Sequence, residues 1–298
     1  MSRTLLLFGA GASYGSDRQG VPPLGYGLYD RLAQYNPPGW GALPDAFKIA
    51  LRQDFEAGVI QIANQRSHDL PILQRAMAHF FFSFQPLTSN LYYRLAQDIR
   101  RDRKSIALST LNYERLLEMS FRGAGINLSI GVPPADRTEL NFPHGCCHLF
   151  CEAARGMASA VSFAGMAVQL NGEVRIIEQT QEFEQRISTD AFPPVMSYFE
   201  PKKRTTAGNN FIEDQRERFR QLTQTVECII VIGIKIREHD RHIWDYIAAA
   251  PGRFIYCSGP GERGAFYNWV AEHRSSKNNT FIDGFWADRY AEIYNLIL

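Results

Sequence analysis

The residues best suited to chemistry near the start of the chain are Gly9-Ala10-Gly11-Ala12-Ser13, directly after the apolar run Leu5-Leu6-Leu7-Phe8. Glycines after a buried strand let the backbone approach a ligand closely, and N–H groups aimed at that point bind a pyrophosphate. The motif lacks the third glycine of the dinucleotide-binding spacing. The residues that follow, up to about position 25, have the composition of a long irregular loop. A tight turn that only packs well has the same residues, so both interpretations stay open on this motif alone.

Two further apolar segments end in polar residues. Thr110 to Glu114 follow the predicted strand 105–110, and Gly233 to Asp240 follow the predicted strand 228–232. Ligands of a doubly wound sheet lie beyond the carboxyl ends of its strands. We therefore expect these two loops and the glycine turn to meet at one edge of a sheet and to form one site.

The elements that position these loops alternate between strands and helices. The short apolar segments read as buried strands, and helical patterns separate them. This alternation predicts an α/β fold with a doubly wound, mainly parallel sheet (Rossmann-like) that helices cover on both faces. We expect one domain over 1–298, with 43–103 as a helical insertion within it. Residues 131–146 are rich in glycine and proline and read as a loop.

Composition and charge exclude several classes of protein. The formal net charge of +1 gives no general attraction to nucleic acid or to a membrane surface. No apolar run approaches the roughly 20 residues that span a bilayer, and the run at 5–8 is too short for a signal peptide. An odd number of cysteines without an export signal favours reduced thiols and a cytoplasmic protein. These are Cys146, Cys147, Cys151, Cys228 and Cys257.

Two groups of side chains suggest a metal ion but lack the usual ligand spacing. Structural zinc usually takes two ligand pairs separated by a longer spacer, and adjacent helical residues face in different directions. We therefore expect no metal, and we interpret the cysteines as small residues packed behind a loop. The two groups are Cys147 and Cys151 with His144 and His148, and His239 with Asp240 and His242.

In their order along the chain, these segments resemble the signature of the Sir2 family. The resemblance covers roughly 4–25, 105–145 and 226–258, and it looks closest to the bacterial SIR2-like branch, whose members are NAD-depleting effectors in antiphage defence. The matching residues are Gly9-Ala10-Gly11-Ala12-Ser13, Ser109-Thr110-Leu111-Asn112-Tyr113-Glu114, Pro143-His144-Gly145, and Val231-Ile232-Gly233 with Asp240.

The resemblance implies a role for each matching segment. The glycine turn would hold the NAD pyrophosphate, and the loop that contains Pro22 would close over the nicotinamide end as a lid. His144 would be the catalytic histidine. The nicotinamide ribose would be contacted by Thr110, Asn112, Tyr113 and Glu114, and the adenosine by Gly233, Asp240 and Ser258.

The chain departs from the deacetylases of that family at several points. It has no pair of Cys-x-x-Cys motifs, which form a zinc ribbon in those enzymes, and Gly20-Val21-Pro22-Pro23-Leu24-Gly25 replaces their G-I-P-D-F-R stretch. Glu114 stands where an aspartate is usual, and Ile234-Lys235 stands where a serine follows the glycine. These changes disfavour acyl-lysine chemistry.

Cleavage of the nicotinamide–ribose bond creates an oxocarbenium-like centre, so the protein must supply orientation, a dry pocket and a nucleophile. Asn112 can donate to a ribose hydroxyl and accept from a water, and His144 can act as general base. With water as nucleophile, the predicted reaction is hydrolysis of NAD to ADP-ribose and nicotinamide. Taken singly, Asn112 has an alternative interpretation as a helix cap, His144 as a loop histidine bonded to backbone, Ser13 as a turn-former and Asp240 as a helix N-terminal residue.

Two other functions stay open at this point: an NAD-dependent protein deacylase, and a non-catalytic subunit that senses a nucleotide. An unregulated NAD hydrolase would kill its own cell, and the chain shows no obvious sensor domain. We therefore expect a homo-oligomer, a regulatory partner, or both. The resemblance suggests a HerA-type ATPase or a short Argonaute-type protein as partner, and the sequence does not choose between them.

Overall fold

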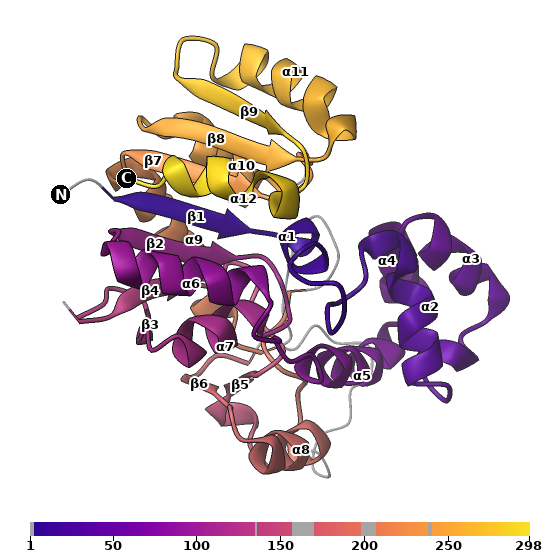
Figure 1. Cartoon of the computed structure of the whole chain (residues 1–298). Helices are drawn as coiled ribbons and strands as arrows, with labels where there is room; N and C mark the ends of the chain where they lie inside the picture. Colours follow the sequence, from indigo (N-terminus) through magenta and orange to yellow (C-terminus); the bar gives the residue numbers. More distant parts are fainter. Residues whose placement is uncertain (1–2, 135, 157–169, 198–206, 238–239) are drawn as a thin grey trace.

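A seven-stranded parallel sheet forms the centre of the molecule (Figure 1). The computed structural model describes residues 3–134, 136–156, 170–197, 207–237 and 240–298. Every neighbouring pair of strands is parallel, and the strand order is β3-β4-β2-β1-β7-β8-β9. The strands are β1 (Thr4–Phe8), β2 (Ile106–Thr110), β3 (Leu128–Ile130), β4 (Thr138–Asn141), β7 (Cys228–Ile232), β8 (Arg253–Ser258) and β9 (Asn279–Asp283).

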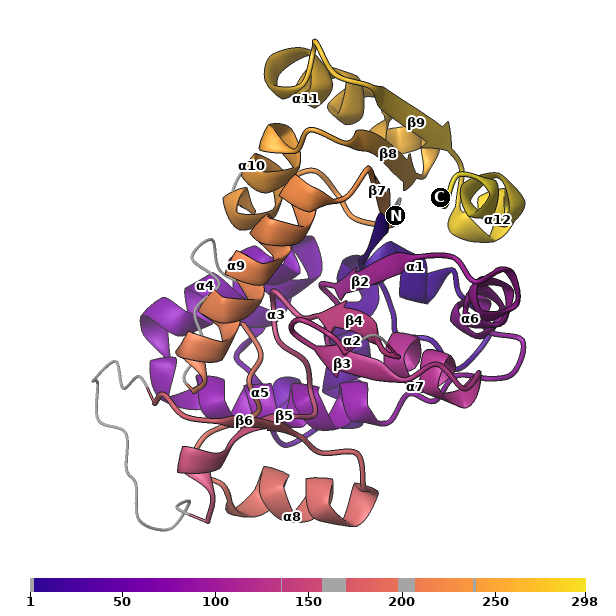
Figure 2. The same ribbon diagram turned by 90° about the vertical axis from the view of Figure 1, so that its left-hand side faces the viewer.

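Helices cover both faces of this sheet, as Figure 2 shows. Leu6 and Phe8 of β1 face one hydrophobic core, and Leu5 and Leu7 face the other, because successive side chains of a strand point to opposite faces. The prediction of a doubly wound α/β fold is confirmed. One face carries α6 (Leu91–Asp102), α7 (Leu116–Gly123) and α12 (Trp286–Asn295), and the other carries α9 (Asn209–Thr225), α10 (Arg241–Ala249) and α11 (Arg263–His273).

Four helices form a separate lobe beside the carboxyl ends of the strands (Figure 1). Trp40 lies at its centre, where its ring stacks on Phe55 and its indole N–H donates to the Leu73 carbonyl at 3.0 Å. The helical lobe consists of α2 (Gly25–Tyr35), α3 (Asp45–Gln53), α4 (Phe55–Gln65) and α5 (Leu70–Phe82). By contrast, α6 packs on the sheet, where Tyr92 meets Phe8 edge to face. The division of the chain at 43–103 stays a prediction.

Three segments differ from the sequence-based expectation. The predicted loop 131–146 contains the strand β4, whose polar residues hid it from a hydrophobic pattern. Glu139 of β4 is fully buried, and it is stabilised by Arg3 at 3.0 Å and by Arg218 at 2.5 Å. The chain also forms α1 (Ala10–Tyr14) directly after β1, where an irregular loop was expected. The strand β5 (Leu149–Cys151) and the helix α8 (Thr180–Thr189) were not predicted. By contrast, β6 (Val174–Ile176), which pairs antiparallel with β5, lies within residues 173–178, whose alternating sequence pattern indicates a strand.

The start of β1 and the last residue, Leu298, meet at the amino edge of the sheet (Figure 1). The backbone N–H of Leu298 donates to the Thr4 hydroxyl oxygen at 3.0 Å. Both ends therefore lie on the edge opposite the loops that carry the predicted site residues. Among the described residues, no helix is both long and apolar enough to cross a membrane.

Candidate active site

The carboxyl edge of the sheet brings the glycine turn and the predicted loops together. The strands β2, β4 and β3 lie on one side of β1, and β7, β8 and β9 lie on the other. The direction in which the chain adds strands therefore reverses between β1 and β7. Such a reversal is where open α/β sheets bind ligands. Gly9 lies there, and its N–H donates to the Ile232 carbonyl at 3.0 Å.

The glycines let two backbone turns touch. Gly233 has a φ of +68°, and a Cβ at this position would lie 2.2 Å from the Ala12 nitrogen. A Cβ on Gly9 would lie 2.3 Å from the Ile234 side chain. The N–H of Gly11 donates to the Gly233 carbonyl at 2.9 Å, and the N–H of Ala12 donates to the Gly9 carbonyl at 2.9 Å. Backbone packing thus accounts for these glycines, and the pyrophosphate contact stays a prediction.

A buried network of polar side chains joins this turn to the loop after β2. The Ser13 hydroxyl donates to Glu114 at 2.5 Å, receives the Asn112 amide at 2.8 Å and lies 2.9 Å from the Tyr92 hydroxyl. Asn112 also donates to the Gly9 carbonyl at 3.1 Å. Burial raises the pKa of Glu114, although its hydrogen bonds from Ser13 and from a backbone N–H oppose that shift. Burial also raises the pKa of Tyr92 well above its ordinary value.

This network changes the predicted role of Asn112. An asparagine amide has two N–H donors, and both donate within the protein, one to Gly9 and one to Ser13. With both donors used inside the protein in this arrangement, the side-chain carbonyl oxygen of Asn112 is the group that can accept from a ligand. The contact of Asn112 with a ribose stays a prediction. Asn112 is not a helix cap either, because Arg115 precedes α7 and Glu114 accepts from the Leu116 N–H at 2.5 Å.

His144 follows β4, the strand that pairs with β2. The loop turns at Gly145, where φ is +75°, and the backbone carbonyl of His144 accepts the Ser197 N–H at 2.8 Å. The loops after β2 and β4 are joined, since the Cys147 N–H donates to the Tyr113 carbonyl at 2.9 Å. Asn112 and His144 thus come from neighbouring strands and connected loops.

Sequence reasoning assigned no catalytic role to His242, which contacts His144. The two Nε2 atoms lie 2.8 Å apart, and an oxygen of the Asp240 carboxylate lies within 4.8 Å of a ring nitrogen of each histidine. Asp240 precedes α10 and His242 lies in its first turn. The available signal was a titratable residue in the first turn of a helix that begins at the carboxyl edge of the sheet.

Other predicted site residues lie at the same edge with separate contacts. The Thr110 hydroxyl accepts the Asn112 N–H at 3.1 Å, and the buried Tyr113 hydroxyl donates to the Ser197 carbonyl at 2.8 Å. Ser258 ends β8, and Pro22 is buried between α1 and α2. Hydrogen bonds of the described part of the chain do not tie Pro22 or Ser258 to the Ser13 network.

Potential metal ligands are also hydrogen-bonded pairs in this structure. Two nitrogens bound to a tetrahedral zinc at about 2.0–2.1 Å lie about 3.3 Å apart, so the 2.8 Å between His144 and His242 is a hydrogen-bond distance. The Cys146 thiol donates to the Tyr113 carbonyl at 3.1 Å and lies 3.2 Å from the His148 Nδ1. All five cysteines are buried and form no disulfide. His239, which the sequence offered as a ligand, lies outside the described residues.

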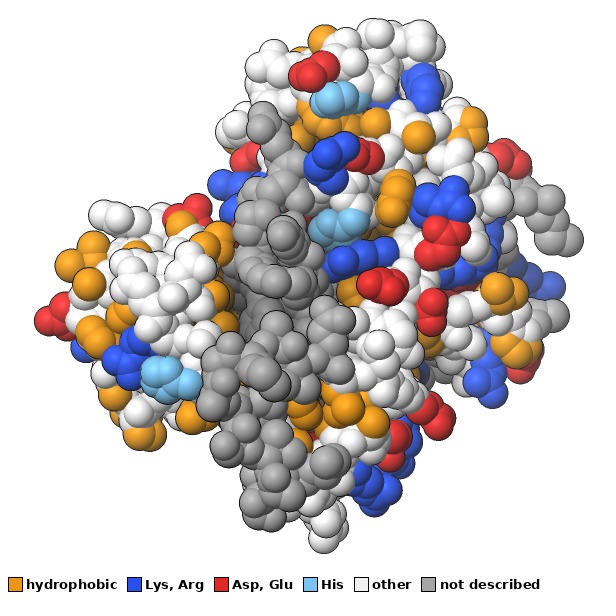
Figure 3. Space-filling view, turned by 180° about the vertical axis from the view of Figure 1, so that it is seen from behind, with side chains coloured by type: hydrophobic (Ala, Val, Ile, Leu, Met, Phe, Trp, Pro, Cys, Tyr) orange, Lys and Arg blue, Asp and Glu red, His pale blue; other side chains and the backbone are white. Residues whose placement is uncertain are grey.

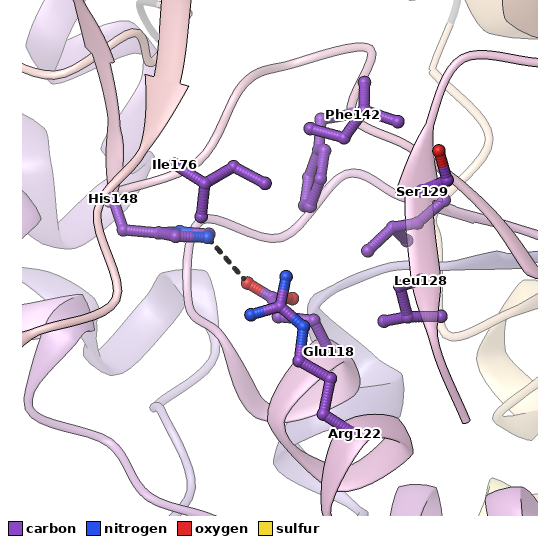
Figure 4. Close-up of a pocket in the computed structure, with 9 residues that line it drawn as sticks. Glu118, Arg122, Leu128, Ser129, Phe142, His148 and Ile176 are labelled. Carbon is purple, nitrogen blue, oxygen red and sulfur yellow. Dashed lines mark ion pairs between the residues drawn. The ribbon is translucent and has the colours of Figure 1, made fainter. Parts of the chain in front are cut away.

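A buried acid and a buried histidine face each other beside a small cavity (Figure 4). Glu118 of α7 lies 3.2 Å from the Nε2 of His148, beside a cavity of about 20 Å³ that has room for one water. Burial, together with the nearby Glu114, raises the pKa of Glu118 to about 8. Burial lowers the pKa of His148 well below its ordinary value. Both shifts favour the neutral form of the side chain.

We expect the variant Glu118→Gln to remove a pH dependence of stability. The unfolded chain ionises this carboxyl near pH 4.3 and the folded chain near pH 8. Between these values only the folded state holds the proton, so raising the pH destabilises the protein. Between pH 6 and pH 8.5, the free energy of unfolding of wild type should fall by about 2–3 kcal/mol more than that of the variant. Urea unfolding at both pH values measures this, and parallel curves for the two proteins would contradict it.

The variant Gly233→Ala tests the contact between the two backbone turns. Gly131→Ala is a matched control, because Gly131 has a φ of +78° but nothing within 4 Å of its Cβ position. We expect the control to lower the free energy of unfolding by about 1–2 kcal/mol, because alanine disfavours the left-handed conformation. Gly233→Ala should cost clearly more, since its Cβ meets the Ala12 backbone. Equal losses in urea unfolding would show that the close approach has no energetic weight.

The comparisons with known proteins concern the fold. No family model matches this chain, and no curated protein matches it. A crystal structure of a Sir2 homologue in complex with NAD superposes with a TM-score of 0.50 and 14% identity, over 99% of this chain and 89% of that chain. A Sir2 homologue variant with 2′-O-acetyl ADP-ribose gives 0.49 and 15%, over 99% and 91%. On the first of these matches, the seven-stranded parallel sheet and its helices make this chain a protein of the Sir2 fold.

Proposed function

We propose that this chain binds NAD at the carboxyl edge of its sheet and hydrolyses the nicotinamide–ribose bond, giving ADP-ribose and nicotinamide. The observation that carries the proposal is the buried connection from the glycine turn through Ser13 to Asn112, with His144 on the adjoining loop. The Sir2 homologue with NAD supports the choice of ligand, since its fold matches over the whole of this chain.

The reaction requires little covalent assistance from the protein, because nicotinamide is already a good leaving group. The protein must fix the ribose, exclude bulk water and place one water at the anomeric carbon. The Asn112 carbonyl oxygen can accept a hydrogen bond from that water or from a ribose hydroxyl. His144 takes up the proton that the water loses when it attacks.

Hydrolysis is favoured over transfer to an acyl-lysine substrate by the departures from the deacetylases. The chain has no Cys-x-x-Cys pair to build a zinc ribbon, and Ile234 and Lys235 replace the expected serine. Ile234 is buried against the Gly9 turn, and its carbonyl accepts the Tyr256 hydroxyl at 2.6 Å. This position therefore serves packing.

We also propose that the enzyme is a cytoplasmic, NAD-depleting effector of bacterial antiphage defence that assembly or a partner protein controls. The helical lobe offers a surface for such assembly, since apolar side chains spread over it in Figure 3. Tyr26 on α2, Ile49 on α3 and Ile72 on α5 are 74%, 56% and 64% exposed. Candidates for the partner are a HerA-type ATPase and a short Argonaute-type protein.

We expect purified protein, with its partner if one is needed, to release nicotinamide from NAD without any peptide. His144→Ala should lower turnover by about 10²–10⁴-fold, the usual contribution of acid–base catalysis. Asn112→Asp keeps the shape but replaces the amide that holds Gly9 and Ser13, and we expect a similar loss. Chromatography of nicotinamide and ADP-ribose measures both.

His273→Ala on the surface of α11 is the control, and thermal unfolding confirms that each variant is folded. Folded variants at both positions with wild-type turnover would end the proposal. Release that depends on an acyl-lysine peptide would identify a deacylase instead. Stabilisation by NAD without any turnover would identify a nucleotide sensor.

Light scattering after size-exclusion chromatography tests assembly. We expect an oligomer, and we expect Ile49→Asp or Ile72→Asp to reduce its mass because a buried charge is costly in an apolar interface. Val132→Asp is the control, since Val132 is also an exposed apolar residue, at 75%, but lies on the loop between β3 and β4. A monomer that is fully active alone would contradict this part of the proposal.

A further inference from the structure

The two histidines at the site form a direct hydrogen bond from two separate elements. His144 lies on the loop after β4 and His242 in the first turn of α10, and their Nε2 atoms are 2.8 Å apart. The ring centroids lie 5.0 Å apart with an angle of 42° between the planes. His144 is buried, and His242 is half-buried.

The chemistry of imidazole restricts what this pair can hold. One facing nitrogen must carry a proton and donate, and the other must be bare and accept. Two imidazolium ions cannot share this distance, because the facing nitrogens would both be donors and the like charges would repel. The pair therefore takes up at most one extra proton and titrates as a unit.

Each ring is held in place by its own element. The backbone of His144 is fixed by the Gly145 turn and by the Ser197 N–H. The helix fixes His242. Because both Nε2 atoms serve the pair, a proton that the neutral His144 ring takes up during a reaction goes to Nδ1.

Two charged groups lie near the pair on the neighbouring elements. Asp240, before α10, brings a carboxylate within 4.8 Å. Arg216 of α9 donates from Nε to the Pro143 carbonyl at 3.3 Å, and it interacts electrostatically with Asp240 and Tyr113. The negative charge of Asp240 favours a cation on the pair, whereas Arg216 opposes it.

We propose that His242 is a positioning residue for His144, which fixes its ring and shares its positive charge during NAD hydrolysis. This inference rests on the proposed function. A proton leaves the attacking water for Nδ1 of His144, and the N–H at Nε2 then donates to the bare Nε2 of His242. The hydroxide adds to the anomeric carbon as the nicotinamide–ribose bond breaks. The electron pair of the broken bond leaves with the nicotinamide. The proton on His144 returns to solvent.

The test compares His242→Ala with His242→Gln in the full chain, with His273→Gln as surface control. The Ala variant removes the hydrogen bond, whereas the Gln side-chain carbonyl can still accept from the Nε2–H of His144. We expect kcat to fall about 10- to 100-fold for Ala with KM unchanged, and to recover partly for Gln. We also expect the rise of kcat/KM with pH to move to lower pH for Ala, because the imidazolium loses its acceptor.

A second readout needs no NAD. Nitrogen NMR of the ¹⁵N-histidine-labelled chain reports the tautomer and the titration of His144, assigned by its loss in His144→Gln. We expect the midpoint for His144 to fall in His242→Ala by about one pH unit, a tenfold change in proton affinity, and to stay near wild type in the surface control.

The two readouts separate this inference from the proposed function. An unchanged tautomer and midpoint in His242→Ala overturns the pairing, whether or not the protein hydrolyses NAD. A shifted midpoint with unchanged kcat confirms the hydrogen bond and overturns its role in the reaction. A shifted midpoint in a chain that never releases nicotinamide refutes the hydrolase and, with it, the role of His242 in that reaction.

Discussion

The candidate site depends on one hydrogen-bonded group, the side-chain amide of Asn112. Its two N–H groups hold the Gly9 carbonyl and the Ser13 hydroxyl, and so they join the turn after β1 to the loop after β2. All partners are buried, so water cannot replace a lost bond. A hydrogen bond in such surroundings is stronger than one in water, and an unmade bond is correspondingly costly. The positions of the glycine turn and of the neighbouring loop are therefore determined together.

Burial has the same effect on ionisable groups behind the site. Glu114 lies on the loop before α7, and Glu118 lies in α7. Both have a raised pKa because their surroundings exclude water. Burial lowers the pKa of His148 for the same reason. By contrast, the His144 pair lies near two charged groups, Asp240 and Arg216.

The sequence allowed the fold class to be predicted because each central strand is short, apolar and followed by a polar loop. It did not reveal β4, since the buried Glu139 is balanced by Arg3 and Arg218, which are distant in sequence. Likewise, no local pattern could show that both N–H groups of the Asn112 amide donate within the protein, because their acceptors lie about a hundred residues away in the sequence. His242 was overlooked as a partner of His144 for the same reason. Residue types could be assigned to loops from the sequence, but their contacts across the sheet required the three-dimensional structure.

The pairing of Leu298 with Thr4 has a practical consequence for handling this protein. An affinity tag, a fluorescent reporter or a surface tether joined to either end leaves from the edge of the sheet that faces away from the loops. Immobilised copies would present those loops to the solution. Joining the two ends by a short linker would also leave the loops uncut, so new termini could be opened elsewhere in the chain without passing through them.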